Sequence, residues 1–263
     1  MRFIKPLNMA TYKKRGYKPK TKAEKEIELE DGSTTAEVFK TLDEGASKTE
    51  AWVEKNQKLI FGFVTIVALC VIGYILYQKF YVEPKQTEAS NEMFQAQTFY
   101  VEALGATEGK DSIYGLALNG RAGKYGFIDI ADKYSGTATG NLANYYAGMS
   151  YLNMKKYQEA INYLDQFSAD DAVLGPQAKG AIGDAFVQLN QKDEALKYYV
   201  EAFNMQDNEV TTPRFLLKAG IIALDLGKSG EALQYFTRIT EEFETSTEFS
   251  KAQVYKGQAE AMQ

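Results

Sequence analysis

The residue types that carry out most enzymatic chemistry are scarce in this chain. Its 263 residues include no histidine and a single cysteine, Cys70. These counts exclude a Ser–His–Asp triad, a Cys–His nucleophile and any histidine metal ligand. Cys70 lies inside a long apolar run, where it cannot act as an aqueous nucleophile, and it has no second cysteine with which to form an intrachain disulfide.

Carboxylate pairs are the remaining candidates for general acid–base chemistry. Asp170 precedes Asp171, and Glu241 precedes Glu242, in predicted turns or helix ends where acidic residues are usually solvated. The glycines between residues 115 and 126 lack the spacing of a phosphate-binding loop. The sequence therefore predicts a protein that is not an enzyme, with no cofactor and no metal site. A membrane-bound enzyme that uses carboxylates remains the alternative from a different class.

Positive charge is concentrated near the N-terminus. Residues 1–25 hold nine Lys or Arg residues against one acid, Glu24. Within them, a basic cluster consists of Lys13, Lys14, Arg15, Lys18, Lys20 and Lys22. Together with glycine and proline, this charge predicts a disordered cytoplasmic tail over residues 1–33. Anionic lipid headgroups or ribosomal RNA would attract the cluster, or it acts only as a topology signal, and these three interpretations stay open.

An uncharged stretch of nineteen residues, 59–77, separates this tail from the rest of the chain. At about 1.5 Å per residue it would form a helix of roughly 28 Å, which matches the hydrocarbon core of a bilayer at roughly 30 Å. A signal peptide is disfavoured because 58 residues precede the stretch and no A-x-A-like cleavage site follows it. The sequence predicts a permanent transmembrane helix over residues 59–78, preceded by a juxtamembrane helix over residues 34–58.

The distribution of charge predicts the orientation of this helix. Four lysines lie in the twenty residues before the span and two in the twenty after it, which places the N-terminus in the cytoplasm. Beyond Lys79 the chain has sixteen basic and twenty-five acidic residues. We therefore expect an acidic extracytoplasmic domain, in the periplasm if the membrane is a bacterial inner membrane.

Small residues recur along one face of the predicted span. Gly62, Thr65 and Gly73 lie on this face around Leu69. Small side chains allow a second transmembrane helix to approach closely, which makes the face a candidate packing surface. Glycine is common in membrane helices in any case, so an ordinary lipid-facing helix remains the alternative.

Three windows of the extracytoplasmic part repeat one pattern: residues 141–167, 176–202 and 213–239. In each window a glycine is followed twelve residues later by an alanine and sixteen residues later by a large residue. The sets are Gly148, Ala160 and Leu164; Gly183, Ala195 and Tyr199; and Gly220, Ala232 and Phe236. Small residues suit the point where two helices cross closely, with the large residue filling the space beside them.

The pattern predicts an all-α domain of stacked helical hairpins over residues 85–263. Pro176 and Pro213 suit the first turn of a helix, where the missing N–H has no intrahelical partner. Two further helical stretches, 88–104 and 124–134, are expected to form a divergent first hairpin. The segment between them is too rich in glycine for one regular helix, and a lone helix near residues 250–263 should close the stack.

In these positions the windows resemble tetratricopeptide repeats, which have small residues at positions eight and twenty and an aromatic residue near position twenty-four. Asn144, Phe167 and Ile239 depart from that pattern. The resemblance implies a partner-binding groove lined by Tyr145, Met149, Asn153, Asp184, Gln188, Arg214, Leu217, Ile221 and Asp225. Tyr145 and Met149 replace the Lys and Asn of carboxylate-binding repeats. A partner domain or an extended apolar segment is thus the expected ligand, while the alternative is that several of these residues pack the repeat interior.

The whole arrangement resembles the YfgM-like family of ancillary subunits of the SecYEG translocon. From about residue 50 to the end, both have one membrane span followed by a tetratricopeptide domain. The resemblance implies a location in the bacterial inner membrane, with SecYEG and a PpiD-like periplasmic chaperone as partners. It implies a scaffold that docks this chaperone or an emerging polypeptide beside the secretion channel. A generic scaffold for envelope assembly, unrelated to the translocon, is the alternative.

Overall fold

The protein is all-helical over the residues that its computed structural model describes, 34–169 and 171–263, with side chains from Trp52 onward. The predicted tail, its basic cluster and Asp170 lie outside these residues. In chain order the elements are α2 (Thr34–Tyr77), η1 (Gln78–Val82), α3 (Glu83–Gly105), α4 (Lys110–Asn119), α5 (Phe127–Lys133), α6 (Ala138–Asn153), α7 (Tyr157–Gln166), α8 (Leu174–Gln188), α9 (Lys192–Met205), α10 (Thr212–Asp225), α11 (Ser229–Glu242) and α12 (Phe249–Ala261). The chain divides into two compact units, one ending at Tyr74 and the other comprising Ile75–Gln263.

Helix α2, most of which belongs to the first unit, contains the apolar stretch identified in the sequence. Within the described residues, one helical run, Trp52–Gly105, is long and apolar enough to cross a membrane, and its most apolar window is entirely exposed. Thr65 is the polar residue inside this window, and its Oγ1 donates a hydrogen bond to the backbone oxygen of Phe61 at 2.7 Å. The helix therefore satisfies its own polar groups, as a helix in lipid must.

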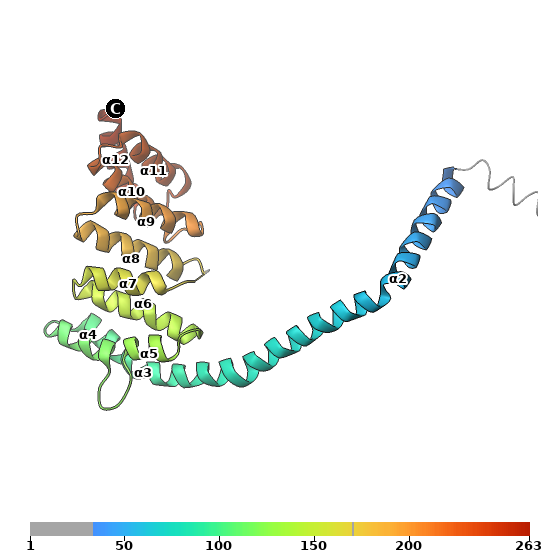
Figure 1. Cartoon of the computed structure of the whole chain (residues 1–263). Coiled ribbons are helices and arrows are strands. Elements are labelled where there is room, and N and C mark those ends of the chain that lie inside the picture. Colours follow the sequence, from blue (N-terminus) through green and yellow to red (C-terminus); the bar gives the residue numbers. More distant parts are fainter. Residues whose placement is uncertain (1–33, 170) are drawn as a thin grey trace, which may run out of the picture. The chain divides into compact units, whose positions relative to one another are not determined.

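The second unit contains the three predicted hairpins, formed by α6 with α7, α8 with α9, and α10 with α11. Figure 1 shows these helices following one another along a single stack. Successive hairpins are in contact through α7 with α8 and through α9 with α10. Each second helix thus packs against the first helix of the next repeat, which is the arrangement of a helical solenoid.

The small and large residues of the repeat pattern meet where the paired helices cross. A Cβ atom added to Gly183 would lie 2.6 Å from Cε1 of Tyr199, and one added to Gly148 would lie 2.5 Å from Cγ of Leu164. Gly220 faces the ring of Phe236 in the same way. Glycine is required at each crossing because the large side chain of the second helix occupies the space of a Cβ.

The two helices of each hairpin are joined by the same tight turn. A residue with positive φ lies seven positions after each of these glycines: Lys155 at 60°, Asn190 at 58° and Gly227 at 73°. In each case the next N–H donates to a carbonyl five residues earlier, as from Lys156 to Tyr151 at 2.9 Å. This 6→1 bond is the Schellman motif, which caps the carbonyls at the end of the first helix.

The start of the stack differs from the sequence prediction. The segment between residues 104 and 124 contains a ten-residue helix, α4, and α3 packs chiefly on α4 while α5 packs on α6. The predicted pairing of 88–104 with 124–134 as the first hairpin was therefore wrong. Gly109 and Gly120, with φ of 68° and 75°, lie at the two ends of α4 rather than interrupting it. Gly115 inside the helix is tolerated because Tyr114, Ala117 and Leu118 bury the adjoining face.

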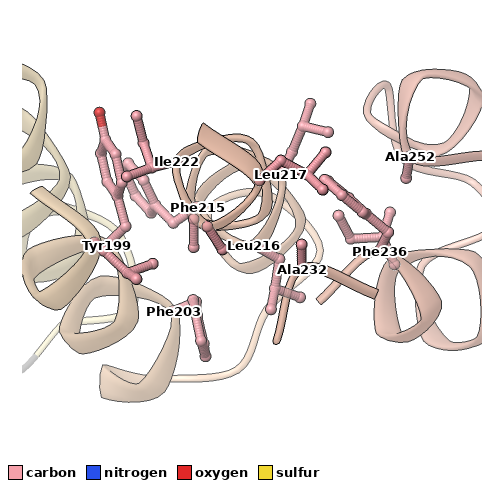
Figure 2. Close-up of a cluster of buried hydrophobic side chains, with 14 of the residues drawn as sticks. Tyr199, Phe203, Phe215, Leu216, Leu217, Ile222, Ala232, Phe236 and Ala252 are labelled. Atoms are coloured by element: carbon pink, nitrogen blue, oxygen red, sulfur yellow. The ribbon is translucent and has the colours of Figure 1, made fainter. Parts of the chain in front are cut away.

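The largest hydrophobic cluster lies at the C-terminal end of the stack. It joins α9, α10, α11 and α12, and its members include Tyr199, Phe215 and Phe236. Figure 2 shows these rings together with Leu216, Leu217 and Ala252. The closing helix α12 contributes Ala252 and Ala259, both fully buried, so the expected lone helix is part of the core at this end.

Candidate partner-docking surface

The residues predicted to line the groove come from the first helix of each repeat. Tyr145, Met149 and Asn153 are on α6; Asp184 and Gln188 are on α8; and Arg214, Leu217, Ile221 and Asp225 are on α10. We call the exposed and half-buried members of this set the first-helix surface. Leu217 is not part of it, because the side chain is 8% exposed and belongs to the core.

Asp184 is the polar centre of the first-helix surface. Its carboxylate accepts hydrogen bonds from the Tyr199 hydroxyl at 2.6 Å and from Nζ of Lys218 at 2.6 Å. Lys218 also lies over the rings of Tyr199 and Phe215, at 5.6 and 5.8 Å from their centroids. Burial of the phenol is the main reason why the pKa of Tyr199 is raised above its usual value of 10.0. The negative charge of Asp184 and its hydrogen bond to the phenol raise the pKa further. The three side chains thus connect the second repeat to the third with opposite charges and a neutral phenol.

Lys218 was absent from the residues selected on sequence. It lies on α10, three positions before Ile221, and is half-buried against α8. The sequence did offer a signal for this ion pair: one repeat has an acid at its ninth position, and the next repeat has a lysine at its sixth. A second link between the same helices joins Nη1 of Arg214 to Oε1 of Gln177 at 3.4 Å. These two contacts place α8 and α10 side by side.

Other predicted polar residues are held at the ends of their helices. Gln188 accepts a hydrogen bond from the hydroxyl of Tyr157 at 3.4 Å. Asp225 forms an exposed ion pair of 3.2 Å with Lys192. Asn153 donates to the backbone oxygen of Met149 in its own helix at 2.7 Å. All three side chains remain exposed, so they can exchange these contacts for a partner at little cost.

The apolar members of the first-helix surface are half-buried. Tyr145 packs its ring against Phe167 and Tyr146, with centroid distances of 5.2 and 5.6 Å. Met149 packs against the two core clusters on either side of α6, while Ile221 packs against the C-terminal cluster. Burial raises the pKa of the Tyr145 phenol. These side chains pack in the core and also leave apolar area accessible to a ligand. They therefore combine the two roles considered for this set, lining a groove and packing the repeat interior.

Asn144 is one of the three residues that depart from the repeat pattern, and its buried polar group is not satisfied. Its side-chain oxygen Oδ1 is buried and has no hydrogen-bond partner among the described residues. A large aromatic residue is expected at this position of a tetratricopeptide repeat. Phe167, the second departure, is 7% exposed and fills space beside Tyr145. Ile239, the third, is fully buried.

The predicted packing face of the apolar helix lies on α2. Leu69 is 63% exposed, and a Cβ added to Gly62 or Gly73 would meet nothing within 4 Å. Gly62, Thr65, Leu69 and Gly73 are therefore open to a neighbour or to lipid. The basic cluster between Lys13 and Lys22 lies outside the described residues.

Among the residues whose side chains the structure describes, from Trp52 onward with the exception of Asp170, no group of three or more Cys, Asp or Glu side chains could hold a metal ion. Asp171 uses its carboxylate to accept hydrogen bonds from the backbone N–H groups of Val173, at 2.8 Å, and Leu174, at 2.5 Å, at the start of α8. Asp171 therefore satisfies two N–H groups in the turn that leads into α8, whose N-cap residue is Val173.

Comparison with known proteins identifies the repeat type. A family model described as tetratricopeptide repeat matches residues 145–206. This range begins in α6 and ends just after α9, so it covers most of the first repeat and all of the second. No curated protein matches the chain. Residues 145–206 thus match the tetratricopeptide repeat, and stacked repeats of this kind create extended concave binding surfaces.

Proposed function

We propose that this chain is a membrane-anchored scaffold that binds a protein partner on its first-helix surface and performs no chemistry of its own. The observation that carries the proposal is the stack of three tetratricopeptide hairpins whose first helices present apolar and polar side chains together. Tyr145, Met149 and Ile221 supply apolar area, while Gln188 and Arg214 supply hydrogen-bonding groups. Such a mixed surface fits a partner domain or an extended apolar segment of a polypeptide.

The apolar helix of the first unit supports the anchoring part of the proposal. Its exposed side chains would have no favourable surroundings in water, whereas a bilayer would bury them. The charge bias of the flanking residues favours a cytoplasmic N-terminus, with the stack on the other side. Anchoring raises the local concentration of the stack near other membrane proteins, so weak contacts at the first-helix surface suffice.

The finer proposal concerns the place of action. The order of a single span and a tetratricopeptide stack resembles ancillary subunits of the SecYEG translocon in bacterial inner membranes. We propose that the partner is a PpiD-like periplasmic chaperone or a polypeptide emerging from the channel. A partner in outer-envelope assembly is the competing outcome of the test below.

The test is quantitative affinity purification of the full-length, detergent-solubilised protein from its native membranes. We expect translocon components and a periplasmic chaperone to co-purify. The double variant Met149→Glu and Ile221→Glu should reduce their recovery by about tenfold, because charge is introduced where a partner must be desolvated. Val210→Glu is the matched control. Val210 is 56% exposed in the turn between α9 and α10 and is not a member of the first-helix surface, so the same change there should leave recovery unaltered.

Because Met149 and Ile221 are half-buried, a second variant separates binding from folding. Gln188→Arg with Arg214→Glu alters exposed side chains, and far-UV circular dichroism should show an unchanged helical content. Equal recovery from both variants and the wild type would contradict binding at this surface. Recovery of outer-envelope components in place of the translocon would keep the scaffold and refute the Sec assignment.

A further inference from the structure

Several aromatic side chains are exposed where the apolar helix runs into the stack. Tyr77 is the last residue of α2, and Phe80 and Tyr81 belong to η1. These three residues are 55%, 73% and 55% exposed. No residue of η1 is buried, although η1 continues directly into α3, the first helix of the stack. The core of the stack therefore does not use these rings.

The exposed apolar residues at this junction point to all sides of the helix. Large side chains occupy the four consecutive positions from Tyr74 to Tyr77, and they are between 49% and 62% exposed. Successive residues of an α-helix are about 100° apart, so four of them cover the whole circumference. A single partner helix would cover one side and leave the others in water. A medium that surrounds the helix is therefore the fitting partner, and a bilayer is such a medium.

The charges along this segment suit the surface of a phospholipid bilayer. Between Leu59 and Val82 the one charged residue is Lys79, and the first acid after the apolar stretch is Glu83. Phosphate groups of phospholipids attract the ammonium of Lys79, whereas they would repel a carboxylate. The exposed rings of η1 thus occur together with a positive charge and without an acid.

Lys85 brings a second positive charge to the same segment. Its side chain is half-buried, and its Nζ lies 5.8 Å from the centroid of the Tyr81 ring. Side chains of a helix point toward its N-terminus, so Lys85 extends from the first turn of α3 back toward η1. The ring of Tyr81 in turn stacks on that of Tyr77, with centroids 5.2 Å apart. The three side chains form a row with apolar rings at one end and an ammonium at the other.

The position of these rings along the chain matches the depth of the headgroup layer. Phe80 and Tyr81 lie three and four residues after Tyr77, the last residue of the uncharged stretch. At about 1.5 Å per residue, they would lie about 5 Å beyond the hydrocarbon core. The headgroup layer adds roughly 5–8 Å on each side of that core. Tyrosine favours this layer because its ring is apolar while its hydroxyl bonds to water and headgroups.

We propose that these side chains form a collar that binds the headgroup layer of the membrane at the end of the apolar helix. The collar consists of Tyr77, Lys79, Phe80, Tyr81 and Lys85. The proposal rests on the anchoring part of the proposed function, and it adds the residues that fix the depth of the anchor. Interfacial aromatic and basic residues set the position of a membrane helix in this way. The collar would therefore hold the first helix of the stack next to the membrane surface.

Depth-dependent fluorescence quenching of the full-length protein tests the collar. Trp52→Phe removes the one tryptophan of the chain, and Tyr81→Trp supplies a single fluorophore. The protein is reconstituted in phosphatidylcholine vesicles whose acyl chains carry bromine either next to the headgroup or near the chain end. We expect the shallow bromine to quench the fluorophore at position 81 about twofold more than the deep bromine, because the ring lies in the headgroup layer.

Two matched variants in the same background complete this measurement. Leu69→Trp lies inside the uncharged stretch, so the deep bromine should quench it more strongly. Val254→Trp is 72% exposed on α12, at the end of the stack opposite α3 (Figure 1), and neither bromine should quench it. Deep quenching at position 69 without a shallow preference at position 81 would keep the anchor and refute the collar. The absence of quenching at position 69 would refute the anchor itself.

A second pair of variants tests whether the rings fix the depth of the helix. With Leu69→Trp as the reporter, Phe80→Ala with Tyr81→Ala should lower the ratio of deep to shallow quenching by about twofold, because the helix loses its interfacial rings. Phe80→Tyr with Tyr81→Phe is the matched control, which keeps both rings and should leave the ratio unaltered. Both positions are exposed, so neither change removes a core contact. A ratio that stays the same in the alanine variant would overturn the collar.

Discussion

At the scale of single residues, the fold depends on glycines that accept a large neighbour. Gly148, Gly183 and Gly220 each face the side chain found sixteen residues later. The same spacing would place Gly257 of α12 opposite a second helix, yet a Cβ added there meets nothing within 4 Å. Gly257 thus differs from the three equivalent glycines because no second helix packs against it.

This difference predicts opposite effects of adding a side chain. Gly183→Leu should lower the free energy of unfolding by about 1–3 kcal/mol or more, because the new atoms overlap the ring of Tyr199. Gly257→Ala should raise it by about 0.5–1 kcal/mol, because alanine favours the helix and meets no neighbour. Urea unfolding of the full-length protein in detergent, followed by circular dichroism, measures both. Destabilisation by Gly257→Ala would show that this face of α12 is covered.

A second prediction at this scale concerns alkaline stability. The folded-state pKa of Tyr199 is raised, so the folded protein holds this proton at pH values where the unfolded chain, with a tyrosine pKa near 10.0, releases it. The contribution to stability is therefore complete below pH 10 and is lost as pH rises above it. We expect the free energy of unfolding to fall by about 1.4 kcal/mol per pH unit from this tyrosine.

Tyr199→Phe separates this effect from other groups that titrate in the same range, including lysines. The variant should be less stable at neutral pH, because the hydrogen bond to Asp184 is lost. Its stability should also depend less steeply on pH above 10. An identical slope in the variant and the wild type would mean that Tyr199 does not hold its proton in the folded state.

At the scale of elements, the tight turn between paired helices has the same backbone conformation in all three repeats, although the residue at its centre differs. Lys155 and Asn190 adopt positive φ where the third repeat has Gly227. A residue with a Cβ pays about 1 kcal/mol in this conformation, although asparagine tolerates it better than lysine. Lys155→Gly should therefore raise the free energy of unfolding by about 0.5–1 kcal/mol, and Gly227→Ala should lower it by a similar amount.

Thermal unfolding of the two variants alongside the wild type measures this prediction. Lys155 is exposed, so the loss of its side chain removes no core contact. Asn190→Gly serves as the intermediate case, with a smaller gain than Lys155→Gly because asparagine already accommodates the turn. A decrease in stability for Lys155→Gly would indicate that the lysine side chain itself supports the turn.

The helices of the repeat could be predicted from sequence, and so could α3, α5 and α12 outside it, whereas α4 could not. The spacing of Gly183 and Tyr199 reflects a contact between neighbouring helices, so it marks the hairpin directly. Helix α4 has no such partner spacing. Its flanking glycines terminate the helix, but in sequence they could not be distinguished from glycines that prevent one.

The residues of the first-helix surface could likewise be predicted only where they follow from the repeat pattern. Positions such as Met149 and Ile221 follow from the repeat register, and the structure places them on the first helices. Leu217 occupies the register position of Tyr145 but is buried, because α10 is enclosed by α9, α11 and α12. The ion pair of Lys218 with Asp184 depends on how two repeats are offset, which the register within one repeat does not specify.

At the scale of the whole molecule, the proposed orientation follows from an unequal distribution of charge. The acidic part beyond Lys79 has a deficit of basic residues, whereas residues 1–25 hold nine Lys or Arg against one acid. Basic segments resist translocation, so the N-terminal part should stay in the cytoplasm. The stack of repeats, including its first-helix surface, would then lie outside the inner membrane.

Labelling with a membrane-impermeant thiol reagent tests this orientation in intact spheroplasts. In a Cys70→Ser background, Lys110→Cys lies at the first residue of α4 and is exposed, so it should react fully from outside. Lys18→Cys should react only after the membrane is permeabilised. A cysteine that replaces Leu69 is the internal control, because a thiol in the hydrocarbon core stays largely protonated and unreactive on either side. Labelling of position 18 with protection of position 110 would reverse the orientation, and the partner would then have to be sought among cytoplasmic proteins.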